Sequence, residues 1–205
     1  MRAKREHATN TGQTYMVTTE TWGRRSLFSN ERWAKLLVDT LYHYRGSAYF
    51  LHEFVVMPDH VHVLVTPQAS LEKAVQFIKG GFSYRAKKGL GSNLEVWQKG
   101  FQDHRIRDAG DCAAHIIYIH QNPVRRGLCE HPGQYPYSSA KAGFELDPLP
   151  QGLKPPTCLG SNGAPEGAPL QSSCIEATEA APLQNSPVGV PKRAPVQNKA
   201  KAKTA

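Results

Sequence analysis

The stretch MPDHVHVLVTP at residues 57–67 decides how the rest of the chain is interpreted. A Pro-Asp turn is followed by β-branched residues and two histidines, which predicts a short strand over residues 60–66. Side chains alternate across a strand, so the three valines face one side, and His60 and His62 face the other. The valine face suits a hydrophobic core. Two neighbouring imidazoles form half of a possible metal site.

The segments around this strand predict an α+β fold. Period-two patterns predict further strands over residues 13–20, 48–56 and 95–106. Apolar residues at helical spacing predict one helix capped by Ser29 or Asn30 and a second capped by Ser70. The order βαββαβ is the ferredoxin-like arrangement, an antiparallel sheet with helices on one face.

A third helix is expected to cover the open face of this sheet. Asp108 and Asp111 suit its start, where acidic groups complement the helix dipole. Pro123 predicts an end near Gln121 or Asn122. Since the valines face the other two helices, this additional helix, which carries Tyr118, is the natural partner of the two histidines.

Composition divides the chain into three parts. Residues 1–11 are polar and predicted to be flexible, and residues 12–143 form the predicted catalytic domain. Residues 144–205 are expected to be a disordered, basic, Pro- and Ala-rich tail. From residue 151 onward the chain has eight of its 15 prolines and no aromatic residue, so it cannot bury enough apolar surface to offset the entropy of ordering.

The formal net charge is +8, and five of these excess positive charges lie in residues 1–150. A basic domain favours an anionic partner such as nucleic acid, although a merely soluble basic domain fits the charge equally well. The four cysteines form no Cys-x-x-Cys pair, so neither a zinc ribbon nor a disulfide framework is indicated. With no apolar run behind the first residues and none elsewhere of membrane-spanning length, the sequence predicts a cytoplasmic protein without a membrane partner.

Tyr118 and Asn122 could complete the site that the histidines begin. They are four residues apart and can project from the same side of one helix. A tyrosine beside a metal ion can act as a nucleophile, because the ion polarises the electrophile. Spacing alone leaves two other interpretations open: a core aromatic residue in an Ile-rich helix, and two satisfied or solvated histidines on a sheet.

Several stretches resemble one family of enzymes. MPDHVHVL at residues 57–64 resembles the HUH motif of single-tyrosine transposases, in which U is a hydrophobic residue, and YIHQNPVRRGL at 118–128 resembles the tyrosine motif of the REP-associated tyrosine transposases. VWQKGFQDH at 96–104 and YPYSS at 135–139 also resemble this branch, with Tyr137 where tryptophan is common. The likeness extends from about Tyr15 to Ala140.

The resemblance implies a metal-dependent single-stranded DNA endonuclease and strand transferase. His60, His62 and Asn122 would hold one divalent ion, Mg²⁺ or Mn²⁺, whereas ligand chemistry alone favours zinc or manganese. Tyr118 would attack the scissile phosphate to form a 5′-phosphotyrosyl link and release a 3′-hydroxyl. A second 3′-hydroxyl could then reverse the link, so that the enzyme cleaves and rejoins DNA without ATP.

The same resemblance implies single-stranded or hairpin DNA from palindromic repeats as the partner, bound by a monomer or a homodimer. Basic residues near the ends of the predicted elements are candidate phosphate contacts, each with a solvated surface position as its alternative: Lys79, Arg85, Lys87, Lys88, Arg105, Arg107, Arg125 and Arg126. Phe82 and Tyr84 are candidates for base stacking.

Two other functions compete with this one. A domesticated hairpin-binding protein would need no chemistry, but His60, His62, Tyr118 and Asn122 are all present. A metal-dependent hydrolase would need a water-activating base, and the sequence offers no carboxylate-rich site for one.

Overall fold

The computed structural model describes residues 12–153. The predicted flexible segment 1–11 and the part of the predicted basic tail at residues 154–205 lie outside the described residues. Within residues 12–153 no helix combines the length and the apolarity that crossing a membrane requires.

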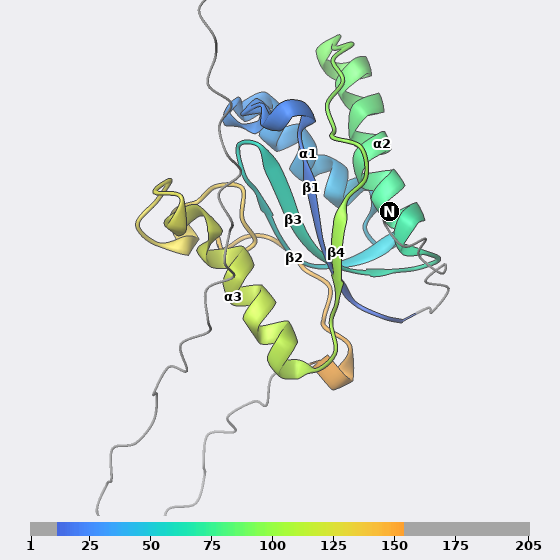
Figure 1. Ribbon diagram of the computed structural model, residues 1–205, viewed down its shortest axis with the longest axis vertical. Helices are drawn as coiled ribbons and strands as arrows, with labels where there is room; N and C mark the ends of the chain where they lie inside the picture. Colours follow the sequence, from blue (N-terminus) through green and yellow to red (C-terminus); the bar gives the residue numbers. More distant parts are fainter. Residues whose placement is uncertain (1–11, 154–205) are drawn as a thin grey trace, which may run out of the picture. The chain divides into compact units, whose positions relative to one another are not determined.

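Four strands and three α-helices follow the predicted order. They are β1 (Tyr15–Glu20), α1 (Glu31–Tyr44), β2 (Tyr49–Val56), β3 (His60–Pro67), α2 (Leu71–Leu90), β4 (Gln102–Arg105) and α3 (Ala109–Arg125). Short 3₁₀ turns occupy Trp22–Arg24, Leu27–Ser29, Pro132–Gln134 and Gln151–Leu153. The strands form one antiparallel sheet in the order β2-β3-β1-β4, which confirms the predicted α+β, ferredoxin-like arrangement (Figure 1).

Side-chain caps start the three helices. The Asn30 side chain accepts the backbone N–H of Arg32 at 3.0 Å. Ser70 and Asp108 cap α2 and α3 in the same way, each accepting the N–H of the third residue that follows it. These bonds satisfy amide donors that have no partner inside the helix, so the polar residues predicted as caps determine where the helices begin.

The predicted end of α3 is wrong. The helix continues through Pro123 to Arg125. Pro123 has no N–H to donate to the preceding turn, but it lies in the last turn and is buried, so one lost hydrogen bond is offset by packing. The longer helix carries Asn122 in a regular helical position.

The two faces of the sheet pack against different helices (Figure 1). Val61, Val63 and Val65 join the larger core with residues of α1 and α2. Leu64 joins a second, smaller core with Ile119 and other residues of α3. The alternation along β3 therefore places His60 and His62 on the face that α3 covers, as the sequence predicts.

A β-bulge in β2 changes which side chains reach α3. Leu51 pairs with Val65, whereas Glu53 pairs with Leu64, so β2 has one more residue here than its partner. Leu51 and Phe54 both lie in the larger core, which strict alternation would forbid. The bulge therefore gives Glu53 a place on the side of the third helix.

Two predicted boundaries differ from the structure. The fourth strand is confined to Gln102–Arg105, because Gly100 has a positive φ of 77° and the preceding segment is irregular. The domain also extends past the predicted end at residue 143. Phe144 stacks on Tyr42, and Asp147 binds Arg45. A composition signal cannot detect these contacts, because their partners lie about a hundred residues earlier in the chain.

A buried chain of hydrogen bonds ties β2 to this C-terminal segment. His52 contacts the carbonyl oxygen of Asp147 through Nδ1 at 3.0 Å and the hydroxyl of Thr66 through Nε2 at 2.7 Å. Since a carbonyl only accepts, Nδ1 carries the proton and Nε2 accepts from Thr66. Thr66 in turn lies 2.8 Å from the hydroxyl of Thr14. Burial of the ring favours this neutral form of His52 by lowering its pKa.

We predict that His52 makes the fold sensitive to mild acid. Burial lowers the pKa of His52 below its usual value, despite its bond to the Asp147 carbonyl. The unfolded chain takes up this proton near pH ~6.5 while the native state resists it, so stability is full above that pH and falls as the pH decreases. Urea unfolding from about pH 7.5 to 5.5 should show a decline that is shallower in His52→Gln, by up to about 1.4 kcal/mol per pH unit. An equal decline in both proteins would contradict this role.

Two adjacent glycines of α2 provide a matched test of helix packing. A Cβ on Gly80 would meet nothing within 4 Å, whereas a Cβ on Gly81 would overlap the ring of Tyr44. Gly80→Ala should therefore raise the free energy of unfolding by about 1 kcal/mol through helix propensity. Gly81→Ala should lose that gain, or destabilise the domain, because Tyr44 must leave its place between the helices. Equal effects in thermal and urea unfolding would show that Tyr44 moves freely.

Candidate active site

The two histidines of β3 lie together beneath α3. Their ring centroids are 4.7 Å apart and the ring planes meet at 78°. Each residue is only 4% exposed. Buried polar side chains require partners, so the interpretation of His60 and His62 as solvated surface residues is wrong.

Each of these rings has one nitrogen fixed by a neighbouring side chain. Nδ1 of His60 lies 2.6 Å from a carboxylate oxygen of Asp59, which can only accept, so Nδ1–H donates. Nδ1 of His62 lies 2.7 Å from the hydroxyl of Thr18. With Nδ1 donating to Thr18, Nε2 of His62 presents a lone pair. That Nε2 is buried and has no hydrogen-bond partner among the described residues.

Burial keeps both imidazoles neutral. It lowers the pKa of His62 to about 3, with the charges of His60 and Arg126 adding to the effect. Burial also lowers the pKa of His60, although Asp59 opposes the shift. A metal ion binds the neutral imidazole, so both rings are in the form that coordination requires at neutral pH.

The residues present fit a divalent metal ion. The unpartnered Nε2 of His62 is the kind of buried atom that a ligand normally satisfies. The hydrogen bonds to Asp59 and Thr18 hold one nitrogen of each ring and so orient the other nitrogen. Histidines that bind metal ions are oriented in the same way, by residues that do not contact the ion themselves. Asn122, 7% exposed on α3, supplies a side-chain carbonyl oxygen on the helix that packs against β3.

Tyr118 reaches the histidines from α3. Its ring centroid is 5.2 Å from that of His62, with an interplanar angle of 73°. The residue is 40% exposed, so it is not the core aromatic that its Ile-rich surroundings also allowed. The guanidinium carbon of Arg125 lies 5.7 Å from the ring centroid. Tyr118 is thus accessible on one side and contacts the histidine pair on the other.

A hydrogen-bonded group fixes α3 two residues beyond the tyrosine. Nε2 of His120 lies 2.8 Å from the carboxylate of Glu53, which also accepts the hydroxyl of Ser139 at 2.5 Å. His120 is thus engaged with a carboxylate of β2 within the protein. Nothing in the sequence pairs residue 53 with residue 120, because the β2 bulge creates their meeting.

A shallow hollow of about 110 Å³ adjoins the histidines on the sheet. It is lined by Thr18 and Glu20 of β1 and by residues 98–102. Thr18 also bonds to His62, and it pairs with Gln102 across the sheet. The hollow therefore offers amide, carboxylate and aromatic groups directly beside the candidate metal ligands.

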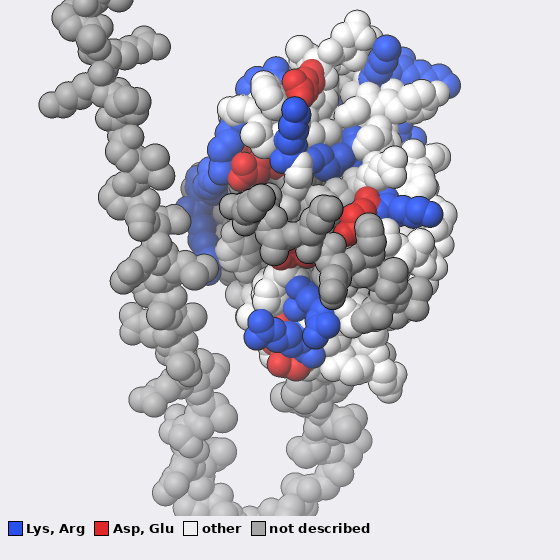
Figure 2. Space-filling model, turned by 45° about the vertical axis from the view of Figure 1, so that its right-hand side comes forward, with Lys and Arg blue, Asp and Glu red and all other residues white. Residues whose placement is uncertain are grey.

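The predicted phosphate contacts occupy different settings. Lys79 donates to the carbonyl oxygens of Gln98 and Gly100, so its ammonium group is engaged within the protein. Arg85 is half-buried in the middle of α2. The remaining six are exposed: Lys87, Lys88, Arg105, Arg107, Arg125 and Arg126. Figure 2 shows several groups of basic side chains with acidic ones among them, rather than one continuous patch.

The two candidates for base stacking, Phe82 and Tyr84, differ in their exposure to solvent. Phe82 is fully buried against Phe28 and Trp97, so its prediction as a stacking residue is wrong. Tyr84 is 63% exposed. Helical spacing places residues 82 and 84 on opposite sides of α2, and only the buried side faces the sheet.

Comparison with known proteins identifies the class that this fold and site define. Residues 10–122 match the family model described as "Transposase IS200 like". The match covers more than half of the chain, which therefore belongs to the IS200-like transposase family, whose members are DNA-cleaving enzymes. The resemblance to the HUH transposases is confirmed.

Two relatives show which members of the family this chain resembles. The REP-associated tyrosine transposase of Escherichia coli (strain K12) is 28% identical over 131 residues, which cover 62% of this chain and 76% of the relative. A Haemophilus influenzae protein assigned to the same group is 31% identical over 108 residues, 47% of this chain and 61% of that protein. This chain thus spans less than two thirds of the H. influenzae relative.

A solved structure supports the fold. The REP-associated tyrosine transposase bound to a REP hairpin superposes with a TM-score of 0.57 at 23% identity. The likeness covers 73% of this chain and 89% of that one. The four-stranded antiparallel sheet and the three helices are therefore shared.

The contact between Glu53 and His120 should contribute measurably to stability. Removing one partner leaves a half-buried polar group unsatisfied, so Glu53→Gln and His120→Gln should each destabilise the domain. In urea unfolding, a double-mutant cycle should give a coupling of about 0.5–3 kcal/mol. The surface pair Glu31–Lys35, fully exposed on α1, serves as the control and should show coupling near zero. Additive effects at Glu53 and His120 would show that the bulge does not hold α3.

Proposed function

We propose that this protein is a metal-dependent single-stranded DNA endonuclease and strand transferase that acts through Tyr118. In this proposal His60, His62 and Asn122 hold one divalent ion, Mg²⁺ or Mn²⁺, and the reaction proceeds through a 5′-phosphotyrosine. The substrate is DNA from palindromic hairpin repeats.

One observation carries the proposal. An accessible tyrosine contacts a buried histidine whose Nε2 has no partner within the described residues. A core tyrosine would not be 40% exposed, and a structural histidine would not leave a buried nitrogen unsatisfied. Family membership independently supports DNA cleavage.

Each group at the site has a separate role in the proposed reaction. The Tyr118 oxygen attacks the phosphorus and loses its proton as the new O–P bond forms. The bond from phosphorus to the 3′-oxygen breaks, and that oxygen takes up a proton to leave as a hydroxyl. A bound divalent ion supplies electrophilic activation of the phosphate. Asp59 and Thr18 hold the two imidazoles in place, so the ligands need no reorganisation during the reaction.

The DNA is expected to pass over the open side of Tyr118. Arg125 and Arg126 follow the tyrosine on α3, and both are exposed. The hollow along residues 98–102 reaches Thr18, the hydrogen-bond partner of His62, and is the proposed place for the strand that flanks the cleavage point. The solved relative is bound to a REP hairpin, which supports hairpin DNA as the substrate here.

In this proposal one chain supplies both the nucleophile and the two histidines. His62 and Tyr118 contact each other within the same chain, with ring centroids 5.2 Å apart. A site shared between two copies is therefore unnecessary. We propose that the monomer is catalytically competent, whether or not a homodimer forms on DNA.

The decisive experiment is a covalent-adduct assay. The full-length protein is incubated with Mg²⁺ or Mn²⁺ and single-stranded oligonucleotides that contain the palindromic repeats flanking its gene. Adduct on a denaturing gel should appear with the wild type and disappear in Tyr118→Phe. Removing a metal ligand in His62→Ala should lower the adduct rate by about 100-fold or more, because the phosphate is no longer activated.

Tyr84→Phe is the matched control, since Tyr84 is an exposed tyrosine on a different helix. It should form adduct at the wild-type rate. Adduct that persists in Tyr118→Phe would rule out the nucleophile. Cleavage that survives the combined change His60→Ala and His62→Ala would rule out the metal site.

A further inference from the structure

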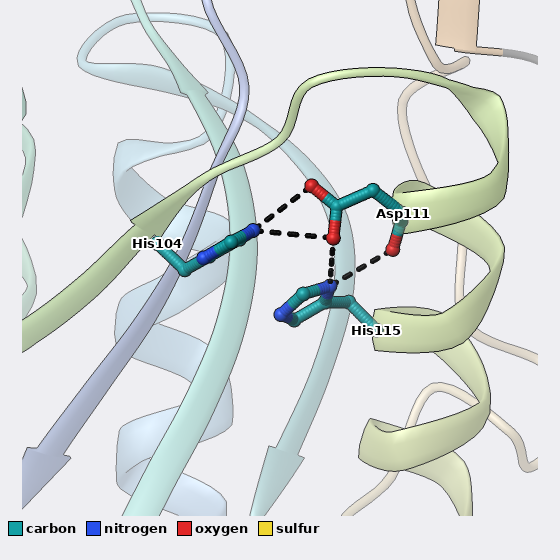
Figure 3. A group of neighbouring side chains, drawn as sticks. All are labelled: His104, Asp111 and His115. Carbon is teal, nitrogen blue, oxygen red and sulfur yellow. Dashed lines mark hydrogen bonds and ion pairs between the residues drawn. The ribbon is translucent and has the colours of Figure 1, made fainter. Parts of the chain in front are cut away.

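A second cluster of potential metal ligands lies at the start of α3 (Figure 3). His104 extends from β4, and Asp111 and His115 extend from the first turns of α3 toward it. Nε2 of His104 lies 2.9 and 3.1 Å from the two carboxylate oxygens of Asp111. Nδ1 of His115 lies 3.1 Å from one of these oxygens.

The arrangement has the geometry of a three-ligand metal site. Asp111 and His115 are four residues apart on one face of α3, and His104 faces them from the neighbouring strand. One donor atom from each residue lies within 4.8 Å of the others. In a tetrahedral site with bonds of about 2.0–2.2 Å, neighbouring donors lie somewhat closer than this, so small side-chain rotations would suffice.

The donor set indicates the chemical class of the ion. Two imidazole nitrogens and one carboxylate oxygen suit Zn²⁺ and related transition metals better than Mg²⁺. All three residues are half-buried, so a fourth position remains open to water or to a ligand.

Hydrogen bonds already connect the three side chains, and Nδ1 of His115 also donates to the backbone carbonyl oxygen of Asp111 at 2.8 Å. The His104 and His115 rings stack with centroids 4.5 Å apart and planes 18° from parallel. Asp111 also accepts the backbone N–H of Arg107. A divalent cation between the three side chains would compensate the carboxylate, and His115 would exchange its bond to the Asp111 carbonyl oxygen for a bond to the ion.

The cluster is separate from the histidine pair of β3. His104 pairs across the sheet with Met16, which pairs in turn with Leu64. His62 lies in the adjacent row, where it pairs with Thr18. Met16 and Leu64 belong to the apolar core between the sheet and α3, so side chains of low polarity lie between the two sites.

We propose that His104, Asp111 and His115 form a second metal site, for Zn²⁺ or a similar transition-metal ion, that fastens the start of α3 to β4. The ion would cross-link the helix to the edge strand one turn before Tyr118. Its role is to hold the tyrosine helix against the sheet, and binding does not depend on the DNA chemistry proposed above.

The test measures Zn²⁺ binding to the full-length protein carrying His60→Ala and His62→Ala, which removes the first site. Isothermal titration should show about one tight equivalent and a rise in the thermal midpoint. Adding His104→Gln or His115→Gln should weaken binding by at least about tenfold, because one of three ligands is lost. Adding His43→Gln, an exposed histidine of α1, should leave binding unchanged.

Thermal unfolding in a chelator separates a metal effect from a folding effect. The variants at His104 and His115 should unfold close to the parent when no metal is present and should lose the Zn²⁺-dependent rise. The proposal is overturned if the parent binds no Zn²⁺. It is equally overturned if His104→Gln and His43→Gln bind Zn²⁺ alike, or if His104→Gln lowers stability equally in the chelator and in Zn²⁺, as the loss of a simple ion pair would. Adduct formation by Tyr118 is scored separately, so failure of one proposal does not imply failure of the other.

Discussion

The burial of both faces of β3 is the constraint on which the rest of the structure depends. This strand is internal to the sheet, between β2 and β1, and every one of its residues is buried. A shift of one residue in its pairing would send the valines toward α3 and the histidines into the apolar core beneath α1 and α2. Burying two unsatisfied imidazoles there would remove a large fraction of the stability of a marginally stable domain. The fold and the position of the candidate site are therefore fixed by the same pairing.

Burial also prepares the histidines for binding. Their low pKa values reflect the energetic cost of charging a ring inside the protein, so the neutral, ligating form is the resting form. Asp59 and Thr18 each fix one nitrogen and thereby orient the other. Because the groups that orient the rings lie within the sheet and its turn, the pair is rigid before any ion arrives.

Much of this could be predicted from local sequence, because alternation and capping act over a few residues. The period of two along 60–66 predicts the orientation of the histidines, the caps at Ser29 or Asn30 and at Ser70 predict two helix starts, and the acidic residues Asp108 and Asp111 predict the third. Contacts that depend on an irregularity could not be predicted. Glu53 reaches His120 only because β2 bulges, and the last turn of α3 accepts Pro123 only because the residue is buried. The segment after residue 143 is held by contacts with Tyr42 and Arg45. A local sequence pattern cannot predict contacts between residues so far apart in the chain.

Helix α3 carries several of the residues discussed above. Its start carries the cluster of Asp111 and His115, its middle carries Tyr118, and His120 follows within one turn. A nucleophile must be held within a fraction of an ångström of its productive position. A helix that packs on an apolar core holds its side chains less precisely when one of its ends can move relative to the sheet. Contacts to β4 on one side of Tyr118 and to β2 on the other remove that freedom. The helix is thus fixed to the sheet on both sides of the tyrosine, and Tyr118 itself remains partly exposed.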